Sequence, residues 1–312
     1  MEYFKVKNLT VPKTYSLQNV GITQSLLSTW KTCRRKFLFS INRWERIEND
    51  RFAYHSMMHY LLEVLYSNQS CKLATILEEL NKYKLPGKPN EIETMKAVAQ
   101  VMISNYIMHY KKDFVEKRFE SVEGKFSIKF GDYLLLGKKD GRFRDKQGGR
   151  WHIEHKNYAR IDEDFLMQHL SFDLQNMFYA LADLIEFKKP LKGVLYNIIR
   201  KPETRKERST QELYQHLEKE VSKNHEYYYI RYEIPYALSE IEEFKLSLNI
   251  QLDELDEILK LCIGFPSHER LAKFYKNESA CDGKYRCPFL GACSTGNMCG
   301  YRQRKVLFPE LI

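Results

Sequence analysis

The fold of this chain is indicated by the stretch Tyr133-Leu134-Leu135-Leu136-Gly137, which leads into Asp140. Residues 126–130 before it and 151–153 after it alternate between apolar and polar side chains. Such alternation is typical of strands with one buried face, and turn-forming residues separate the runs. The three runs therefore predict consecutive antiparallel strands.

Helical periodicity dominates on both sides of these strands. We expect helices at 23–37, 57–65 and 92–106 before them, and at 164–187, 211–222 and 238–261 after them. Further strands are expected at 193–199 and 227–232, and a mobile surface loop at 201–208. Strands and helices that alternate in this way predict an α/β protein with a small mixed sheet flanked by helices.

Composition restricts the class of protein. The 312 residues include 50 basic and 41 acidic side chains, a net charge of +9, and 43% of them are hydrophobic. This hydrophobic fraction is enough for a buried core, and the positive charge suits a polyanionic partner without identifying one. Since no apolar run reaches the ~20 residues of a membrane span and no signal peptide is recognisable, we expect a cytoplasmic protein without a membrane.

Acidic and basic side chains gather around the predicted strands. Asp140 follows one strand, and Glu154 and Lys156 lie two apart on the next, so their side chains share one face. Carboxylate oxygens are the ligands that Mg²⁺ and Mn²⁺ prefer, and a lysine beside them can orient water and stabilise developing negative charge. This pattern predicts a metal site that hydrolyses phosphodiesters.

A second pair lies on the predicted helix that follows. Gln175 and Tyr179 are four residues apart and therefore share one helix face. From there they could contact a substrate phosphate or position Lys156. Glu123, at the start of the strand region, binds a second metal in one interpretation and merely caps the first strand in the other.

These residues resemble the PD-(D/E)XK nuclease superfamily, in the branch of RecB-type helicase-nucleases, CRISPR-adaptation exonucleases and related phage nucleases. The resemblance extends over most of 21–293. Residues 23–37 are similar to the opening helix of that branch, and Met58-His59-Tyr60-Leu61-Leu62-Glu63 is similar to its His-x-x-Leu-Glu element. The resemblance implies that His59 ligates the metal with Asp140 and Glu154. His55 departs from the pattern, because relatives often have Gly there.

The resemblance also implies a fold and an activity. The fold would have a restriction-endonuclease-like core, and the activity would be a Mg²⁺- or Mn²⁺-dependent DNA exonuclease that acts on single-stranded ends. The implied settings are DNA recombination and repair, phage DNA processing or CRISPR adaptation, in the cytoplasm, at the nucleoid or in a phage host. The alternatives are a structure-specific or restriction-type endonuclease, and a non-catalytic DNA-binding scaffold.

Partners follow from the same resemblance. The chain has no Gly-x₄-Gly-Lys-Ser/Thr motif, so any unwinding of DNA must come from a helicase or another recombination or adaptation protein. Basic residues at 34–36, Lys138 and Lys139 are candidates for contacting the DNA backbone. Trp30, Trp44, Phe178 and Tyr179 are candidates for stacking on bases, and the alternative of equal weight is that they belong to the core.

Cysteines are concentrated near the C-terminus. In many relatives one cysteine of the opening helix joins three C-terminal ones to hold a [4Fe–4S] cluster, and four thiolates complete such a ligand set. Cys33, Cys287 and Cys293 match the ligand positions of that pattern, but Lys284 stands at the fourth. Cys281 is the substitute that we nominate for it, with Cys299 as a second candidate. Zinc bound by the C-terminal cysteines, or no metal at all, are the alternatives.

Together these expectations divide the chain into three regions. Residues 1–120 form a helical region that is integral to the nuclease domain, and 121–262 form the catalytic core. Residues 263–312 form a Cys-rich extension that packs back on the N-terminal helix.

Overall fold

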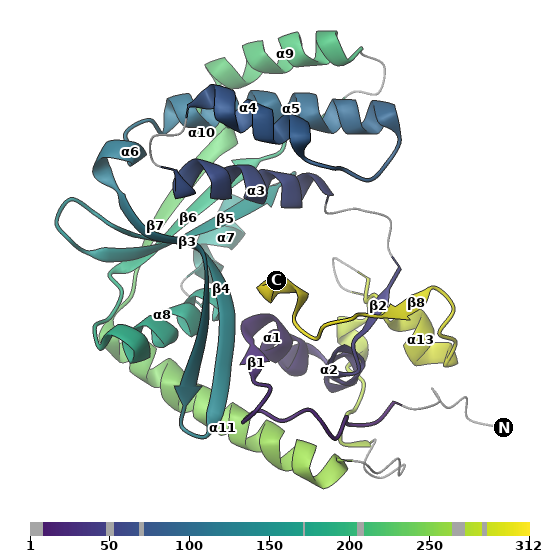
Figure 1. The fold of residues 1–312 in the computed structure, drawn as a ribbon. Helices are drawn as coiled ribbons and strands as arrows, with labels where there is room; N and C mark the ends of the chain where they lie inside the picture. The colour runs from purple at the N-terminus through teal and green to yellow at the C-terminus, as the bar shows by residue number, and fades with distance from the viewer. Residues whose placement is uncertain are drawn as a thin grey trace.

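A mixed six-stranded sheet lies at the centre of the protein (Figure 1). The computed structural model describes residues 9–47, 53–68, 72–170, 172–204, 209–263, 272–282 and 286–312. The strands of the sheet are β1 (Ile22–Thr23), β3 (Arg118–Phe130), β4 (Tyr133–Arg144), β5 (Arg150–Tyr158), β6 (Gly193–Arg200) and β7 (Tyr229–Pro235). Their order is β1-β4-β5-β6-β7, and β3 pairs with β4. The predicted mixed sheet with flanking helices is therefore confirmed.

The three predicted consecutive strands form the part of the sheet that carries the acidic residues. β3 and β4 form a long antiparallel hairpin, and β5 returns antiparallel to the end of β4. β6 then runs parallel to β5, after a crossover through the helices α7 (Glu163–Leu170) and α8 (Leu174–Phe187). All three strands extend beyond the alternating runs, because β3 and β4 stay paired into the charged residues 138–144 and β5 stays paired with β6 as far as Tyr158.

Helices cover the sheet on both faces (Figure 1). One apolar cluster joins the sheet to α3 (Ala53–Ser67), α4 (Leu73–Lys82), α5 (Pro89–His109) and α9 (Thr210–Lys223). The other joins it to α1 (Gln24–Thr32), α2 (Arg34–Ile41), α8 and α11 (Leu238–Cys262). Val194 and Tyr196 of β6 belong to one cluster and Leu195 to the other, so this strand is buried on both faces.

Two predicted helices are interrupted where side chains or backbone geometry favour a break. The helix expected over 23–37 ends at Thr32, because Cys33 has an extended backbone, and α2 starts at Arg34. The helix expected over 164–187 is two helices, and Asp173 caps the second by accepting a hydrogen bond from the Asn176 N–H. Sequence periodicity passes over such breaks because both halves bury apolar side chains.

Shorter elements complete the described chain. α6 (Asp113–Glu116) precedes the sheet, and α10 (His225–Tyr228) precedes β7. The C-terminal region contains η1 (Glu278–Ala280), α13 (Leu290–Thr295), β8 (Tyr301–Gln303) and η2 (Pro309–Leu311). The predicted loop at 201–208 lies outside the described residues at 205–208. No helix in the described ranges is long and apolar enough to cross a membrane.

The C-terminal region returns to the N-terminal helices. β8 pairs antiparallel with β2 (Trp44–Arg46), which follows α2. The Asn277 side-chain amide donates to the carbonyl of Thr32 at 2.8 Å, and the Arg35 Nε donates to the carbonyl of Phe274, also at 2.8 Å. These contacts place the cysteine-containing region against the α1–α2 junction.

A buried carboxylate ties α8 to the sheet. Asp183 is fully buried and forms an ion pair with Lys139 of β4, and the Nε2 of His152 on β5 lies 2.9 Å from it. Burial opposes the charge, but hydrogen bonds from His152 and Lys139 lower the pKa of Asp183 well below its usual range. An apolar residue in place of Asp183 would leave the buried Lys139 and His152 without their hydrogen-bond partner.

We predict that Asp183→Asn lowers the free energy of unfolding by roughly 3 kcal/mol, because Lys139 is left as a buried charge without its partner. Urea denaturation measures this change. Asp164→Asn, an exposed position on α7, is the matched control and should change stability by less than about 0.5 kcal/mol. Equal effects of the two substitutions would contradict the structural role of Asp183.

Candidate metal centre

The site lies where one edge of β4 has no strand partner, between its pairing with β1 and its pairing with β5; we call this position the fork. β5 pairs with β4 from Gly141 onward, whereas β1 pairs with it at Leu135 and Leu136. Between these points the edge of β4 that faces away from β3 is open, and side chains supply the missing partners. The Asp140 carboxylate accepts a hydrogen bond from the His155 N–H at 2.7 Å, and the Tyr179 hydroxyl donates to the Lys138 carbonyl at 2.8 Å.

Three acidic residues stand side by side at this fork. The ladder pairs of β3 and β4 place Glu123 opposite Asp140, and Glu154 lies one step beyond the last β4–β5 pair, on the other side of Asp140. Glu123 has a φ of 49°, in the left-handed region that residues with a side chain rarely adopt. Such strain occurs mainly at functional sites, where the surrounding structure enforces it.

The chain brings a metal-type donor group together at the same place. His59, Glu123 and Asp140 each offer one ligand atom within 4.8 Å of the others, which is the one such group among the described residues. His59 Nδ1 lies 3.8 Å from the nearer Asp140 oxygen, and its Nε2 is buried without a hydrogen-bond partner. Burial lowers the pKa of His59 to about 4, so the imidazole is neutral and keeps a lone pair for a ligand.

Glu154, Lys156 and Gln175 form a closed triangle of hydrogen bonds beside that group. The Lys156 ammonium donates to Glu154 at 2.6 Å and to the Gln175 side-chain oxygen at 3.1 Å. The Gln175 amide donates to the same Glu154 oxygen at 2.8 Å. The sequence grouped His59, Asp140 and Glu154 as ligands; the structure instead has Glu123 in the donor group and Glu154 in contact with Lys156.

Electrostatics at the fork favour a positive charge. Burial, followed by the charge of Glu123, raises the pKa of Asp140, and burial followed by the charge of Asp140 raises that of Glu154. Burial would lower the pKa of Lys156, but the nearby Glu154 and Asp140 raise it, so the ammonium stays charged. Neighbouring buried carboxylates repel each other, and a bound divalent cation would relieve that repulsion.

A buried polar network fixes β5 from behind the site. The Asn197 side-chain amide donates to His155 Nδ1 at 2.8 Å, and its oxygen accepts from Arg231 at 2.8 Å. Arg231 pairs in turn with the buried Asp113 at 2.7 Å. His155 is held by the hydrogen bond of its side chain with Asn197 and by that of its N–H with Asp140. These bonds restrict the movement of the strand that carries Glu154 relative to Asp140.

The donor group opens into a cavity of about 420 Å³. Its walls include the start of α1 (Thr23–Ser25), one face of α3, the fork of the sheet and the C-terminal Glu310. Gly137 lies beside Phe126 and Tyr179 so closely that a Cβ atom there would overlap the Phe126 ring. The absence of a side chain at Gly137 thus lets Tyr179 reach the Lys138 carbonyl.

Sequence reasoning missed several residues of this cavity. His55 lines it, and its ring centroid lies 4.8 Å from that of His59, one helical turn along α3. The i, i+4 spacing of the two histidines was a signal that could have revealed His55. Glu310 had no such signal, because it reaches the cavity from the other end of the chain.

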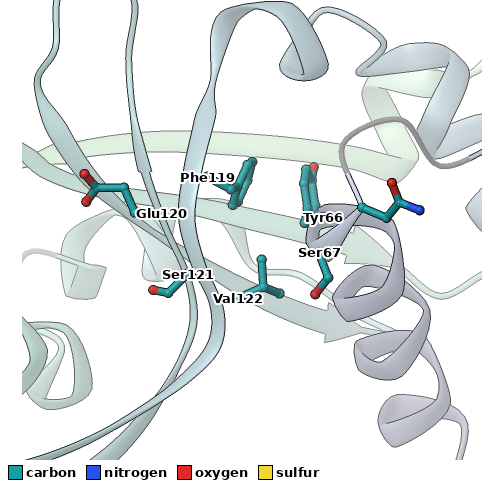
Figure 2. A pocket seen from close by; sticks show the side chains of 7 residues that line it. Tyr66, Ser67, Phe119, Glu120, Ser121 and Val122 are labelled. Carbon is teal, nitrogen blue, oxygen red and sulfur yellow. The ribbon is translucent and has the colours of Figure 1, made fainter.

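A second cavity, of about 590 Å³, lies between the C-terminal end of α3 and β3 (Figure 2). In Figure 2 the side chains of Tyr66, Phe119 and Val122 face this space, and Glu120 points away from it. Glu120 pairs with Arg144 at 2.6 Å and Arg150 at 2.9 Å. Among the described residues, no group of metal-type donors lies in this cavity; the one such group lies at the cavity of about 420 Å³.

Part of the predicted DNA-binding surface is occupied by internal contacts. Lys139 is buried against Asp183, and Arg34 is paired with Glu254 and stacked on the Trp30 ring. Trp30 and Phe178 are core residues, so the interpretation that they stack on bases is wrong. Single-sequence patterns do not reveal that an acidic residue on another element neutralises a basic one.

The cysteines nominated from the sequence gather at the α1–α2 junction. The charge of Cys33 contributes to raising the pKa of both Cys281 and Cys293, after burial in each case, and Cys287 also raises that of Cys281. Cys33 is buried, and the Cys287 N–H donates to the carbonyl of Cys281 at 3.0 Å. Cys299 is exposed. In the described ranges, however, no three cysteines have thiols within 4.8 Å of one another.

Comparison with known proteins gives little further information. No protein-family model matches the chain, and no curated protein sequence matches it. A solved structure described as SSO0001 is similar over 62% of this chain and 85% of its own, with 15% identity and a TM-score of 0.25. A similarity at that level supports no inference about fold or function.

We predict that Mn²⁺ stabilises the protein more at pH 8 than at pH 6. Asp140 and Glu154 have folded-state pKa values above their unfolded ones, so the stability they contribute is greatest in acid and is lost as pH rises. A cation that replaces the protons therefore contributes most at high pH. Thermal unfolding with and without Mn²⁺ at both pH values measures the effect.

Asp140→Asn should abolish most of the Mn²⁺-dependent rise in melting temperature, because it removes a donor from the group. Asp132→Asn, in the exposed β3–β4 turn, is the matched control and should leave it intact. A Mn²⁺ effect that is equal at both pH values, or that survives in Asp140→Asn, would argue against a metal at this position.

Proposed function

We propose that this protein is a Mg²⁺- or Mn²⁺-dependent deoxyribonuclease of the PD-(D/E)XK type that hydrolyses DNA from single-stranded ends. The observation that carries the proposal is the donor group of His59, Glu123 and Asp140, with Glu154 and Lys156 on the neighbouring strand. The imidazole of His59 and the carboxylates of Glu123 and Asp140 line one cavity, and the Glu154–Lys156 pair lies beside them. This combination of groups matches the requirements of phosphodiester hydrolysis.

The donor set fits a divalent cation. The buried Nε2 of His59 lacks a partner, and burial, followed by the charge of a neighbouring carboxylate, raises the pKa of Asp140 and of Glu154. His59, Glu123 and Asp140 would hold the ion, with Glu154 as the adjacent carboxylate. Bound there, the ion would supply Lewis acidity toward both water and the phosphate group.

The remaining residues have roles that follow from their contacts. Lys156 would orient the attacking water and donate to a phosphate oxygen, because its ammonium is charged and lies beside Glu154. Gln175 holds Lys156 in place through its side-chain oxygen. Tyr179 supports the strand that carries Asp140, because its hydroxyl donates to the Lys138 carbonyl and is thus committed to the backbone.

A single DNA strand is the substrate class that we favour. The cavity of about 420 Å³ is in the range of sites for small ligands, and walls from α1, α3 and the sheet surround it. One strand end fits such a space more readily than an intact duplex. The net charge of +9 assists the approach of a polyanion.

A [4Fe–4S] cluster at the α1–α2 junction is a second part of the proposal. Sulfur ligands of one tetrahedral zinc ion lie about 3.8 Å apart, given Zn–S bonds of about 2.3 Å. The described thiols lie near enough to influence one another's pKa, although no three of them lie within 4.8 Å of one another. The choice of an iron–sulfur cluster over one zinc ion therefore rests on the resemblance of the cysteine pattern. Cys33, Cys281, Cys287 and Cys293 would be its ligands and would tie the C-terminal region to α2.

We predict that Lys156→Ala lowers the rate of Mn²⁺-dependent cleavage of single-stranded DNA at least 100-fold, because the charged group beside the reacting phosphate is lost. The release of nucleotides from an end-labelled linear strand measures this rate. Lys146→Ala is the matched control, because Lys146 is an exposed loop residue, and its rate should equal that of the wild type.

Circular single-stranded DNA of the same sequence distinguishes the modes of cleavage. Resistance of the circle supports an exonuclease, whereas cleavage of the circle would indicate an endonuclease with the same site. Equal activity of Lys156→Ala and the wild type would contradict the assignment of the site itself.

We predict that protein purified without oxygen is brown and absorbs near 400 nm, and that Cys33→Ser loses this absorbance. Iron and sulfide analysis quantifies the cluster. Cys262→Ser is the control, because Cys262 is a buried cysteine of α11 that is not one of the four nominated ligands, and should retain the absorbance. Zinc in place of iron, bound in stoichiometric amount, would contradict the cluster.

A further inference from the structure

The C-terminal segment 309–312 lies near α1 (Figure 1), and its Glu310 lines the cavity that holds the metal-type donors. Glu310 of η2 accepts hydrogen bonds from the hydroxyls of Thr23 and Ser25, both at 2.9 Å and both to the same carboxylate oxygen. Along the chain, Glu310 lies 287 residues from Thr23 and 285 residues from Ser25. The contact therefore exists only because the chain folds the C-terminus over the start of α1.

The start of α1 suits an anion. Thr23 caps the helix, since its hydroxyl oxygen accepts from the Leu26 N–H, and the first turn of α1 contains no acidic residue. The N-terminus of a helix has a partial positive charge, and hydroxyls there donate to carboxylate and phosphate oxygens alike. Glu310 is thus the negative group that the helix itself lacks.

The contact lies inside the candidate catalytic cavity. Thr23, Ser25 and Glu310 line the same space as His59, Glu123 and Asp140. When one phosphate of a nucleic-acid strand lies at the donor group, the adjacent phosphates of that strand lie along the other walls of the same cavity. The carboxylate of Glu310 therefore stands where a second anion of the substrate would meet its hydrogen-bond donors.

We propose that Thr23 and Ser25 form a subsite for a backbone phosphate of the DNA strand, and that Glu310 occupies this subsite in the free protein. This inference rests on the proposed nuclease function. The segment 309–312 would then compete with DNA and would have to leave before the strand can bind fully. Glu310 acts as an internal mimic of a phosphate group.

The hold on Glu310 is weak enough for such an exchange. In the described ranges its carboxylate forms no ion pair, and of its two hydroxyl partners Ser25 is exposed, whereas Thr23 is buried. Glu310 and Ile312 are exposed, so the segment buries little apolar surface. Removing it should leave the folded core unchanged.

The test compares Glu310→Gln and a chain that ends at Phe308 with the wild type. Binding of a fluorescent single-stranded DNA is measured by anisotropy, with Ca²⁺ in place of Mg²⁺ so that the strand stays intact. Both variants should bind about threefold or more tightly, because a negative charge is removed from the path of the strand. Glu257→Gln, which removes the same charge from α11 outside the cavity, should bind like the wild type.

A second pair of variants tests the subsite itself. Ser25→Ala in the shortened chain should lose the gain in affinity, because the phosphate no longer finds that hydroxyl. Melting temperatures confirm that each variant is folded. DNA binding by the wild type with no gain for Glu310→Gln or for the shortened chain would overturn this inference alone. Absence of DNA binding in every folded variant would overturn the proposed function instead.

Discussion

The site depends on an interruption of the hydrogen-bond ladder in the central sheet. β4 stays paired with β3 throughout, but on its other edge it leaves β5 below Gly141 and meets β1 only at Leu135 and Leu136. Buried backbone groups without partners cost about 1–3 kcal/mol each. Asp140 and Tyr179 supply the partners for the His155 N–H and the Lys138 carbonyl, so backbone pairing already fixes both side chains without any ligand.

The buried charges around that interruption cost folding free energy, which interactions elsewhere in the fold must offset. Burial raises the pKa of Asp140 and Glu154, and Glu123 has a left-handed backbone. Each of these features destabilises the folded chain relative to an apolar sheet. The polar network through Asn197 and Arg231 on one side, and the Asp183 cluster on the other, hold the strands in position despite this strain. A bound cation would convert the repulsion between carboxylates into attraction.

The parts of the site that the sequence predicts are those that depend on local spacing. Glu154 and Lys156 meet because alternate residues of a strand share a face, and Gln175 and Tyr179 lie together because four residues make about one helical turn. The mixed sheet follows from the alternation of apolar residues. These patterns can be recognised without information about which other segments pack against them.

The parts that it does not predict depend on contacts between distant segments. The position of Glu123 beside Asp140 follows from strand register and an unusual φ, and neither has a local signal. Lys139 resembles a DNA-binding residue until Asp183 of α8 is seen to neutralise it. The hydrogen bond from Asn277 to the Thr32 carbonyl, beside the break at Cys33, and the contact of Glu310 with Thr23 join segments that are far apart in the sequence.

The central claim is that one divalent cation binds where β3, β4 and α3 meet. Crystals grown with Mn²⁺ test it most directly, because anomalous scattering locates the ion independently of any activity. The account predicts an anomalous peak within bonding distance of His59, Glu123 and Asp140, the three donors that already lie within 4.8 Å of one another. A fully occupied Mn²⁺ peak elsewhere, with these three side chains unliganded at saturating Mn²⁺, would contradict it.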